Sequence, residues 1–225
     1  MGLTWRAAGR APKNAGAEEA VMDASVLESY RKNWPRVGAV LGMVLGGATA
    51  LASRGKVTNL RALSAVNAIA LLVHQYEEYE DPGYFPGQFN RGMFKSDQPL
   101  NYPLNTHNAM CINTAIAYPF YALPMLLPKV KWLGIAPVLF GMGQAVGHGV
   151  VFPVMSRSKY SPGFLASIFL HTPIGLAYLA ALKKHAAVTR GDWIKSVAYM
   201  VMFALPFGLS VDGSGQECGM ISRCW

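Results

Sequence analysis

The stretch WLGIAPVLFGMGQAVGHGVVFPVM, residues 132–155, decides the fold class, because it runs for 24 residues without Asp, Glu, Lys or Arg. A helix needs about 20 residues to cross a bilayer. A buried helix of a soluble protein normally shows a polar stripe, and this stretch is apolar nearly all round. Lipid is therefore the better solvent for it, and we predict a transmembrane helix here.

Five further segments share this character and contain no charged residue apart from Arg61 and Lys195. They are residues 37–52, 60–74, 106–127, 162–182 and 193–211. The last three are long enough to span alone, whereas the first two rely on flanking residues. Gly and Pro inside the segments are tolerated in membrane bundles. We predict an all-α fold, a polytopic transmembrane helix bundle of about six membrane helices, with five as the alternative count.

Three regions follow from this pattern: a polar, basic N-terminal arm at 1–36, partly helical around 21–34; a transmembrane domain at 37–211; and a polar tail at 212–225. The tail contains Cys218 and Cys224, whose redox state stays open.

Only 14% of residues are charged, which excludes a disordered chain. The net charge of +8 is spread as small basic groups between apolar runs, which is typical of a multi-pass membrane protein and excludes nucleic acid as a partner. If all six segments span, eleven basic residues lie on the N-terminal side of the membrane and nine on the other side. Because the more basic side usually faces the cytosol, this small difference predicts a cytosolic N-terminus. The sequence does not indicate which membrane contains the protein.

The stretch His74-Gln75-Tyr76-Glu77-Glu78-Tyr79 closes the second apolar segment. On a helix, Glu77 and Glu78 lie three and four residues after His74 and share its face. A charge at bilayer depth costs about 2.5–3.5 kcal/mol on insertion scales, so three ionisable residues at this position require a functional or structural explanation. The residues are either ligands of Zn or Fe, an acid/base set, or an ordinary charged helix end.

Connectivity places the end of the second segment, both ends of the 79–105 linker, and the junction of the fourth and fifth segments on one membrane side. Most of the unusual polar residues lie at these ends, so we expect them to converge. The predicted catalytic residues are Glu77, Glu78 and His148, and the predicted metal ligands are His74, Glu77, Glu78 and His148. Possible substrate-binding or supporting residues are Asn67, Asn90, Asn108, Asn113, Gln144, Tyr160 and His171.

The linker 79–105 is rich in Pro, Gly and aromatic residues. This composition favours an ordered interfacial or re-entrant lid over a soft linker. The alternative is a structured turn with no part in catalysis.

Two blocks of residues resemble the HXXEE-domain family of multi-pass membrane proteins. The first is the 74–79 stretch followed by Phe85-Pro86 and Phe89-Asn90, and the second is His148 followed by Tyr160-Ser161-Pro162-Gly163. A Thr often follows the Pro-Gly of the family, whereas Ser167 is the nearest hydroxyl here. Because the family has no settled activity, the resemblance implies the architecture and the site but no reaction.

Three functions remain open from the sequence. The first is an enzyme that acts on a lipidic or isoprenoid-like molecule by metal-dependent hydrolysis or oxidation, with Zn or Fe as cofactor. The second is a metal-free acid/base isomerase or cyclase that uses Glu77 and Glu78. The third is a transporter or a membrane partner subunit without enzymatic activity. The expected partners are the lipid bilayer and, for an enzyme, a hydrophobic small-molecule substrate; the oligomeric state stays open.

Overall fold

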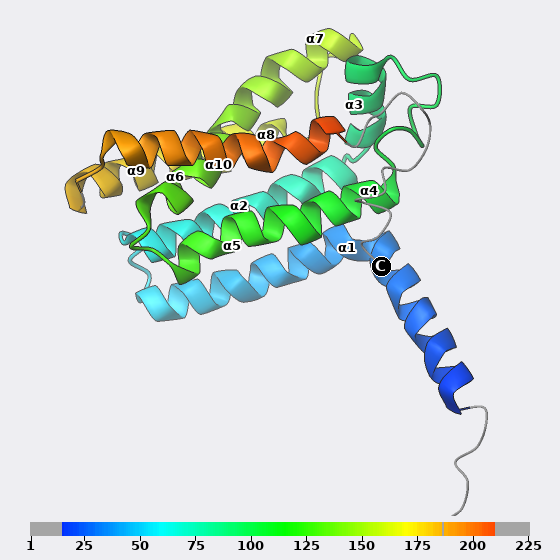
Figure 1. Ribbon diagram of the computed structural model, residues 1–225, viewed down its shortest axis with the longest axis horizontal. Helices are drawn as coiled ribbons and strands as arrows, with labels where there is room; N and C mark the ends of the chain where they lie inside the picture. Colours follow the sequence, from blue (N-terminus) through cyan, green and yellow to red (C-terminus); the bar gives the residue numbers. More distant parts are fainter. Residues whose placement is uncertain (1–14, 186, 210–225) are drawn as a thin grey trace, which may run out of the picture. The chain divides into compact units, whose positions relative to one another are not determined.

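The computed structural model describes residues 15–185 and 187–209, and every regular element in these ranges is helical (Figure 1). The all-α prediction is therefore confirmed. The chain divides into two compact units at the Asn33–Trp34 bond. Helix α1 (Ala15–Ser53) runs through this boundary, so the predicted first apolar segment is the second part of a longer helix. The predicted tail with Cys218 and Cys224 lies outside the described residues.

The second unit consists of helices joined by short connections. The single helices are α2 (Leu60–Tyr79), α3 (Phe85–Phe94) and α10 (Arg190–Leu209). Three longer runs each contain a π-helical segment: α4 (Thr106–Cys111), η1 (Ile112–Ala117) and α5 (Tyr118–Leu126); α6 (Lys131–Val146), η2 (Gly147–Val151) and α7 (Phe152–Ser156); and α8 (Phe164–Ala166), η3 (Ser167–His171) and α9 (Thr172–His185).

Among the described residues, four helices are long and apolar enough to cross a membrane: Ser25–Ser53, Thr106–Leu126, Lys131–Ser156 and Phe164–Lys184. The remaining predicted membrane segments form α2 and α10, which are not among these four. Much of α2 is buried, including His74 and Gln75, since it packs against α5, α6, α8, η3 and α9. A helix enclosed by other helices does not have to be apolar on every face, and α2 is the helix that contains the HxxEE residues. The chain has the architecture of an integral membrane protein.

Close helix approach and aromatic packing hold this arrangement. On α1, Cβ atoms added at Gly38 and Gly42 would meet the side chain of Leu72 on α2 at 3.5 and 3.6 Å, so this small-residue face lies against a helix of the same chain. Elsewhere, Phe120 of α5 stacks on Phe203 of α10 with ring centroids 4.0 Å apart. These contacts fix the helices that surround α2.

Each π segment is followed by a proline at the second residue of the next α-helix. These prolines are Pro119, Pro153 and Pro173. A proline in a helix lacks an N–H and clashes with the carbonyl four residues earlier. Each segment is closed by a bond between residues five apart, such as the Phe152 N–H to the Gly147 carbonyl. The π turn thus accommodates the proline without ending the helical run, and π segments of this kind are frequent at functional sites.

Candidate functional site

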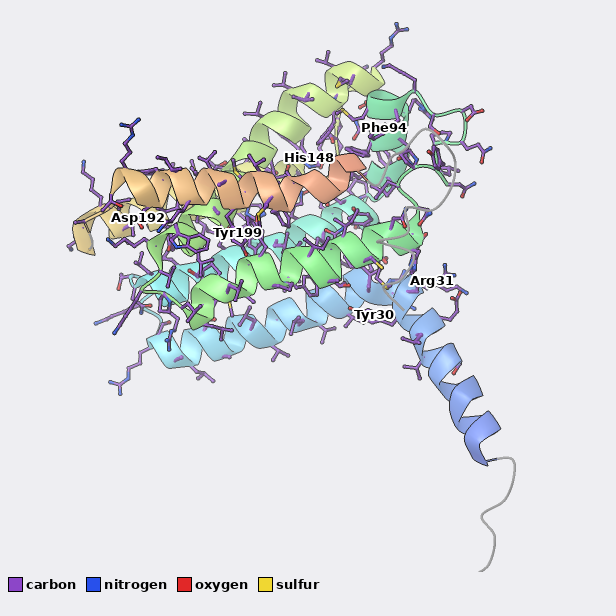
Figure 2. The ribbon with its side chains drawn as sticks, in the orientation of Figure 1. Tyr30, Arg31, Phe94, His148, Asp192 and Tyr199 are labelled. Carbon is purple, nitrogen blue, oxygen red and sulfur yellow. The ribbon has the colours of Figure 1, made fainter. Side chains whose placement is uncertain are left out.

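The centre of the site is formed by His74 and Glu78 of α2 and His148 of η2. The Nε2 atoms of His74 and His148 lie 3.4 and 3.3 Å from the same oxygen, Glu78 Oε1. All three residues are buried, the two histidines at 1% exposure and Glu78 at 5%. In Figure 2, His148 is labelled toward the end of the helical unit that contains α3, and Asp192 toward the opposite end. The structure therefore brings together two residues of the HxxEE stretch and a histidine 70 residues after Glu78 in the chain.

The hydrogen bonds of Ser167 next to His74 Nδ1 determine which tautomer the neutral His74 ring adopts. The hydroxyl of Ser167 donates to the Gly163 carbonyl at 2.6 Å. Its proton is then used, so at 3.4 Å it can only accept from His74 Nδ1. The neutral ring then bears its proton on Nδ1 and leaves the Nε2 lone pair directed at the Glu78 oxygen. His148 has a matching contact, with its Nδ1 3.0 Å from Ser161 Oγ.

The two inward-facing ring nitrogens at the centre are unsatisfied. Neither His74 Nε2 nor His148 Nε2 has a hydrogen-bond partner among the described residues. The Nε2 lone pair of His74 and the carboxylate oxygen of Glu78 repel each other unless a cation lies between them. The three ligand atoms all lie within 4.8 Å of one another. Ligands about 2.0–2.1 Å from a tetrahedral metal are about 3.3–3.4 Å apart, which matches both nitrogen–oxygen distances. The group could therefore hold a metal ion.

Gly163 allows the two imidazoles to approach each other. It has a φ of +97°, a backbone conformation that favours glycine. A Cβ atom here would lie 2.8 Å from Cε1 of both His74 and His148. The ring centroids of the two histidines are 4.9 Å apart at an interplanar angle of 83°. Any side chain at this position would push the rings away from their common focus.

Glu77, which the sequence predicts as a ligand, is not part of the group of ligand atoms. Its carboxylate accepts hydrogen bonds from the backbone N–H groups of Leu165 and Ala166, at 3.1 and 2.8 Å, and from the Tyr160 hydroxyl. Burial, and then the hydrogen bond and charge of Glu77, raise the pKa of Tyr160. Glu77 thus anchors α2 to the start of the helical run 164–185, where the N–H groups lack intrahelical partners.

Two of the predicted supporting residues form a layer behind His74, Glu78 and His148, the candidate metal-ligating group. His171 Nδ1 lies 3.1 Å from Asn67 Oδ1, and the His171 ring packs on His74 with centroids 5.4 Å apart. His171 itself is not among the clustered ligand atoms. It packs against the ring of a candidate ligand and fills the space next to it.

The remaining predicted residues divide between the cavity and the linker. Asn113 accepts from the Gln75 amide at 2.9 Å and, with Gln144, lines the cavity described below. Asn90 instead binds both the N–H and the carbonyl of Leu104, at 2.9 Å each, and so holds the linker in place. Asn108 donates to the Pro103 carbonyl at 3.2 Å. The structure places Asn90 and Asn108 in structural roles outside the cavity lining.

A cavity of about 190 Å³ opens onto the candidate metal-ligating group. Apart from His74, Glu78, His148 and a few polar groups, its lining is apolar: Leu71, Phe85, Phe89, Leu104, Ala117, Phe140, Phe152, Phe203 and Ala204. Helix α3 of the linker supplies Phe85 and Phe89, and the Phe85 ring lies 4.8 Å from that of His148. The linker is thus an ordered part of the cavity wall.

Sequence reasoning does not identify the residues that orient the imidazoles. Ser161 and Gly163 belong to the second family block and Ser167 lies near it, but the motif assigns them no role. Ser161 and Ser167 are fully buried, at 0% exposure, and burial is not visible in the sequence. The available signal is the chain order, since all three lie between the end of the fourth apolar segment and His171, close to the predicted convergence.

Comparison with known proteins supports the family resemblance that was based on the 74–79 stretch and on His148 followed by residues 160–163. No curated protein matches the chain, and neither does any solved structure. The family model described as "protein of unknown function with HXXEE motif" matches residues 65–178, just over half of the 225 residues. This range includes His74, Glu78, His148 and the residues that orient them. The chain belongs to this family of proteins with the HXXEE motif.

Proposed function

We propose that the protein is a membrane enzyme in which His74, Glu78 and His148 bind a zinc or iron ion and act on a hydrophobic small molecule. The observation that supports this most is the pair of buried Nε2 atoms without hydrogen-bond partners, both directed at Glu78 Oε1. Two histidines and a carboxylate are a common ligand set of catalytic zinc and of non-haem iron.

The surrounding residues are suited to such a centre. Metal-binding histidines usually hold the other ring nitrogen in a hydrogen bond, which fixes the tautomer and the ring orientation. Here Ser167 and Ser161 occupy that position on His74 and His148. Three protein ligands leave coordination positions open for water or substrate.

The cavity limits the substrate. Its volume of about 190 Å³ is below the roughly 300–1,000 Å³ of pockets that enclose a whole drug-sized ligand. An apolar cavity of about 150 Å³ is sufficient for a molecule the size of benzene. The cavity therefore suits the reacting end of a lipidic or isoprenoid-like molecule, with the remaining chain lying outside it.

The identity of the metal decides the reaction class. Zinc lowers the pKa of a bound water to about 7 and polarises a carbonyl, which favours hydrolysis. With zinc held by His74, Glu78 and His148, the carbonyl carbon would exchange its bond to the departing group for a bond to the water oxygen, and the departing group would take up the water proton. Iron held by two histidines and a carboxylate favours oxidation with dioxygen as the oxidant.

Elemental analysis of the detergent-purified protein tests the proposal. Wild type should contain about one zinc or iron ion per chain, and His74→Ala and His148→Ala should lose it. His107→Ala is the matched control, because His107 lies near Cys111 and outside the ligand group. Wild-type protein that takes up neither zinc nor iron when these are supplied would overturn the proposal.

A metal-free acid/base enzyme is the second candidate, since one carboxylate oxygen close to two imidazoles could share a proton with them. Glu78 would then be the acid, because the carboxylate of Glu77 already accepts three hydrogen bonds. Metal-free wild-type protein with undiminished turnover that Glu78→Gln abolishes would favour this candidate.

A further inference from the structure

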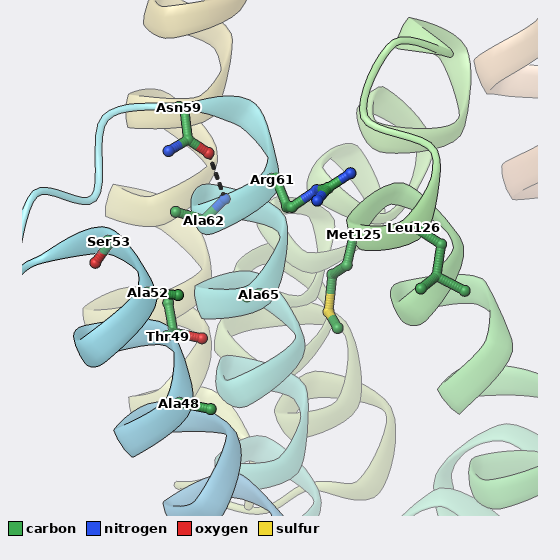
Figure 3. A pocket seen from close by; sticks show the side chains of 10 residues that line it. All are labelled: Ala48, Thr49, Ala52, Ser53, Asn59, Arg61, Ala62, Ala65, Met125 and Leu126. Carbon is green, nitrogen blue, oxygen red and sulfur yellow. Dashed lines mark hydrogen bonds between the residues drawn. The ribbon is translucent and has the colours of Figure 1, made fainter.

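A second and larger cavity lies at the end of the helical unit opposite the candidate metal centre. It has a volume of about 540 Å³, within the roughly 300–1,000 Å³ typical of ligand sites. The last turns of α1, the first turns of α2 and the last turn of α5 form its walls (Figure 3). Its polar lining residues are Thr49, Ser53, Asn59 and Arg61, and the others are alanines of α1 and α2 and two apolar residues of α5.

Arg61 is the single charged residue of this lining. Figure 3 shows its side chain extending from the first turn of α2 toward the end of α5, where Met125 lies. Within the described part of the chain its guanidinium makes no hydrogen bond or ion pair. The first turn of α2 contains no acidic residue, so a cation is placed beside the positive end of the helix dipole without compensation. An anion bound at Arg61 would pair with the guanidinium and would also compensate the positive end of the α2 dipole.

The charge of the surroundings favours the same ligand. The helix ends and connections on this side hold nine basic residues and one acidic residue, Asp192. The basic residues are Arg54, Lys56, Arg61, Lys129, Lys131, Lys183, Lys184, Arg190 and Lys195. Asp192 is already engaged by the N–H and hydroxyl of Thr189, at 2.9 and 2.8 Å. Asp192 also lies 3.9 Å from Lys131, so none of the described residues at this end supplies a counter-charge to Arg61.

Apart from Arg61 and the polar side chains of Thr49, Ser53 and Asn59, the lining of the cavity is apolar. Ala48 and Ala52 lie one turn apart on α1 and face Ala62 and Ala65 of α2 across the cavity. Small side chains on both helices leave space between α1 and α2. A molecule with an anionic group at one end and a hydrocarbon chain at the other would complement Arg61 and this apolar lining.

We propose that this cavity binds an anionic phospholipid, with the phosphate on Arg61 and the start of an acyl chain between α1, α2 and α5. The guanidinium matches phosphate by paired hydrogen bonds. This site is separate from the candidate metal centre and does not depend on the proposed function.

The test measures lipid binding to the detergent-purified full chain by native mass spectrometry. Phosphatidylglycerol, phosphatidylcholine and inorganic phosphate are titrated separately. Wild type should bind phosphatidylglycerol most tightly, and Arg61→Gln should weaken this binding roughly ten- to hundredfold, as expected for loss of a charged hydrogen-bond pair. Ala52→Leu keeps the charge but fills the cavity, and it should weaken binding of phosphatidylglycerol as well.

Lys56→Gln is the matched control, because Lys56 is exposed at the same end but does not line the cavity. It should bind phosphatidylglycerol as wild type does. The proposal is overturned if Arg61→Gln binds as wild type, if Lys56→Gln loses as much affinity as Arg61→Gln, or if inorganic phosphate alone binds as tightly as the lipid. Melting temperatures and metal content should not change in any of these variants, since Arg61 and Ala52 are both exposed and remote from His74.

Discussion

Replacing Gly163 by alanine should both lower the stability of the protein and distort the candidate metal-ligating group. The left-handed backbone at φ +97° costs an L-residue about 1–2 kcal/mol. The added Cβ would lie 2.8 Å from Cε1 of His74 and of His148, and inserting an atom into a packed interior costs about 1–3 kcal/mol. The two effects have separate causes, so we expect a loss of about 2–5 kcal/mol in the free energy of unfolding.

Thermal unfolding of the detergent-purified variant measures this loss. For a chain of 150–250 residues, 1 kcal/mol shifts the melting temperature by about 2–4 °C, which gives an expected decrease of about 4–20 °C. Gly143→Ala is the matched control, since Gly143 lies in α6 without a positive φ and a Cβ added there would meet no atom within 4 Å. Alanine is the better helix former by up to about 1 kcal/mol, so this variant should melt at or above the wild-type temperature.

The metal content provides a second readout of the same substitution. Rings pushed apart by the new methyl group can no longer direct both Nε2 atoms at one point, so Gly163→Ala should bind less zinc or iron than Gly143→Ala. Equal melting temperatures for the two variants would refute the close approach of Gly163 to the imidazoles. A destabilised variant with full metal content would refute its link to the metal-ligating group.

Three further substitutions test individual contacts of the site. Ser161→Ala removes the hydroxyl next to His148 Nδ1 and should weaken metal binding roughly 10- to 100-fold in a chelator competition; unchanged affinity would contradict an orienting role. Glu77→Gln should lose about 1.5–3 kcal/mol of stability in thermal melts while keeping the metal, because charge-assisted hydrogen bonds are lost outside the ligand group; loss of metal without loss of stability would argue for a direct ligand role. Burial and Glu77 raise the pKa of Tyr160 above its ordinary value of about 10, so the stability from this hydrogen bond is fully present below about pH 10 and disappears as the pH rises through the raised pKa. Tyr160→Phe should therefore melt below wild type by a constant amount from about pH 7 to 9, and the difference should shrink above about pH 10; a difference that grows at higher pH would reverse the assigned sign.

The helices and the centre of the site could be predicted because both follow from local rules. Uncharged runs of membrane length can only be helices in lipid, and spacing of four residues places His74 and Glu78 on one face. His148 followed from connectivity, because helix ends on the same membrane side must lie near each other. None of these inferences required knowledge of a side-chain contact.

The choice between the two glutamates could not be made from spacing. Glu77 and Glu78 are both helical neighbours of His74, and the roughly 100° between successive residues directs them to different neighbours. Glu78 faces His148 at 3.3 Å, whereas Glu77 meets the first N–H groups of the run that begins at Phe164. Which helix lies on which side of α2 is a property of the packed bundle. The motif thus combines one carboxylate for the centre and one that attaches α2 to a neighbouring helix.

The prolines show most clearly why local sequence rules predict the helices but not the direction of the side chains along them. In the sequence they are breakers that a membrane bundle tolerates, but Pro119, Pro153 and Pro173 each follow a π segment. A π turn adds one residue to the helical repeat, so it changes the direction of the side chains before and after it. The three segments contain Asn113, His148 and His171, which all face α2.

Proline alone does not predict this feature, because Pro124 and Pro137 stand inside regular α-helix. The prolines that follow a π turn differ from Pro124 and Pro137 in the tertiary contacts that the π turn makes possible. A π turn weakens regular helical hydrogen bonding, and it persists where tertiary contacts offset that cost, as the contacts of Asn113 with Gln75, of His148 with Ser161 and of His171 with Asn67 do here. A histidine or amide shortly before a proline in a membrane helix therefore becomes informative only together with a polar helix such as α2, against which it can pack.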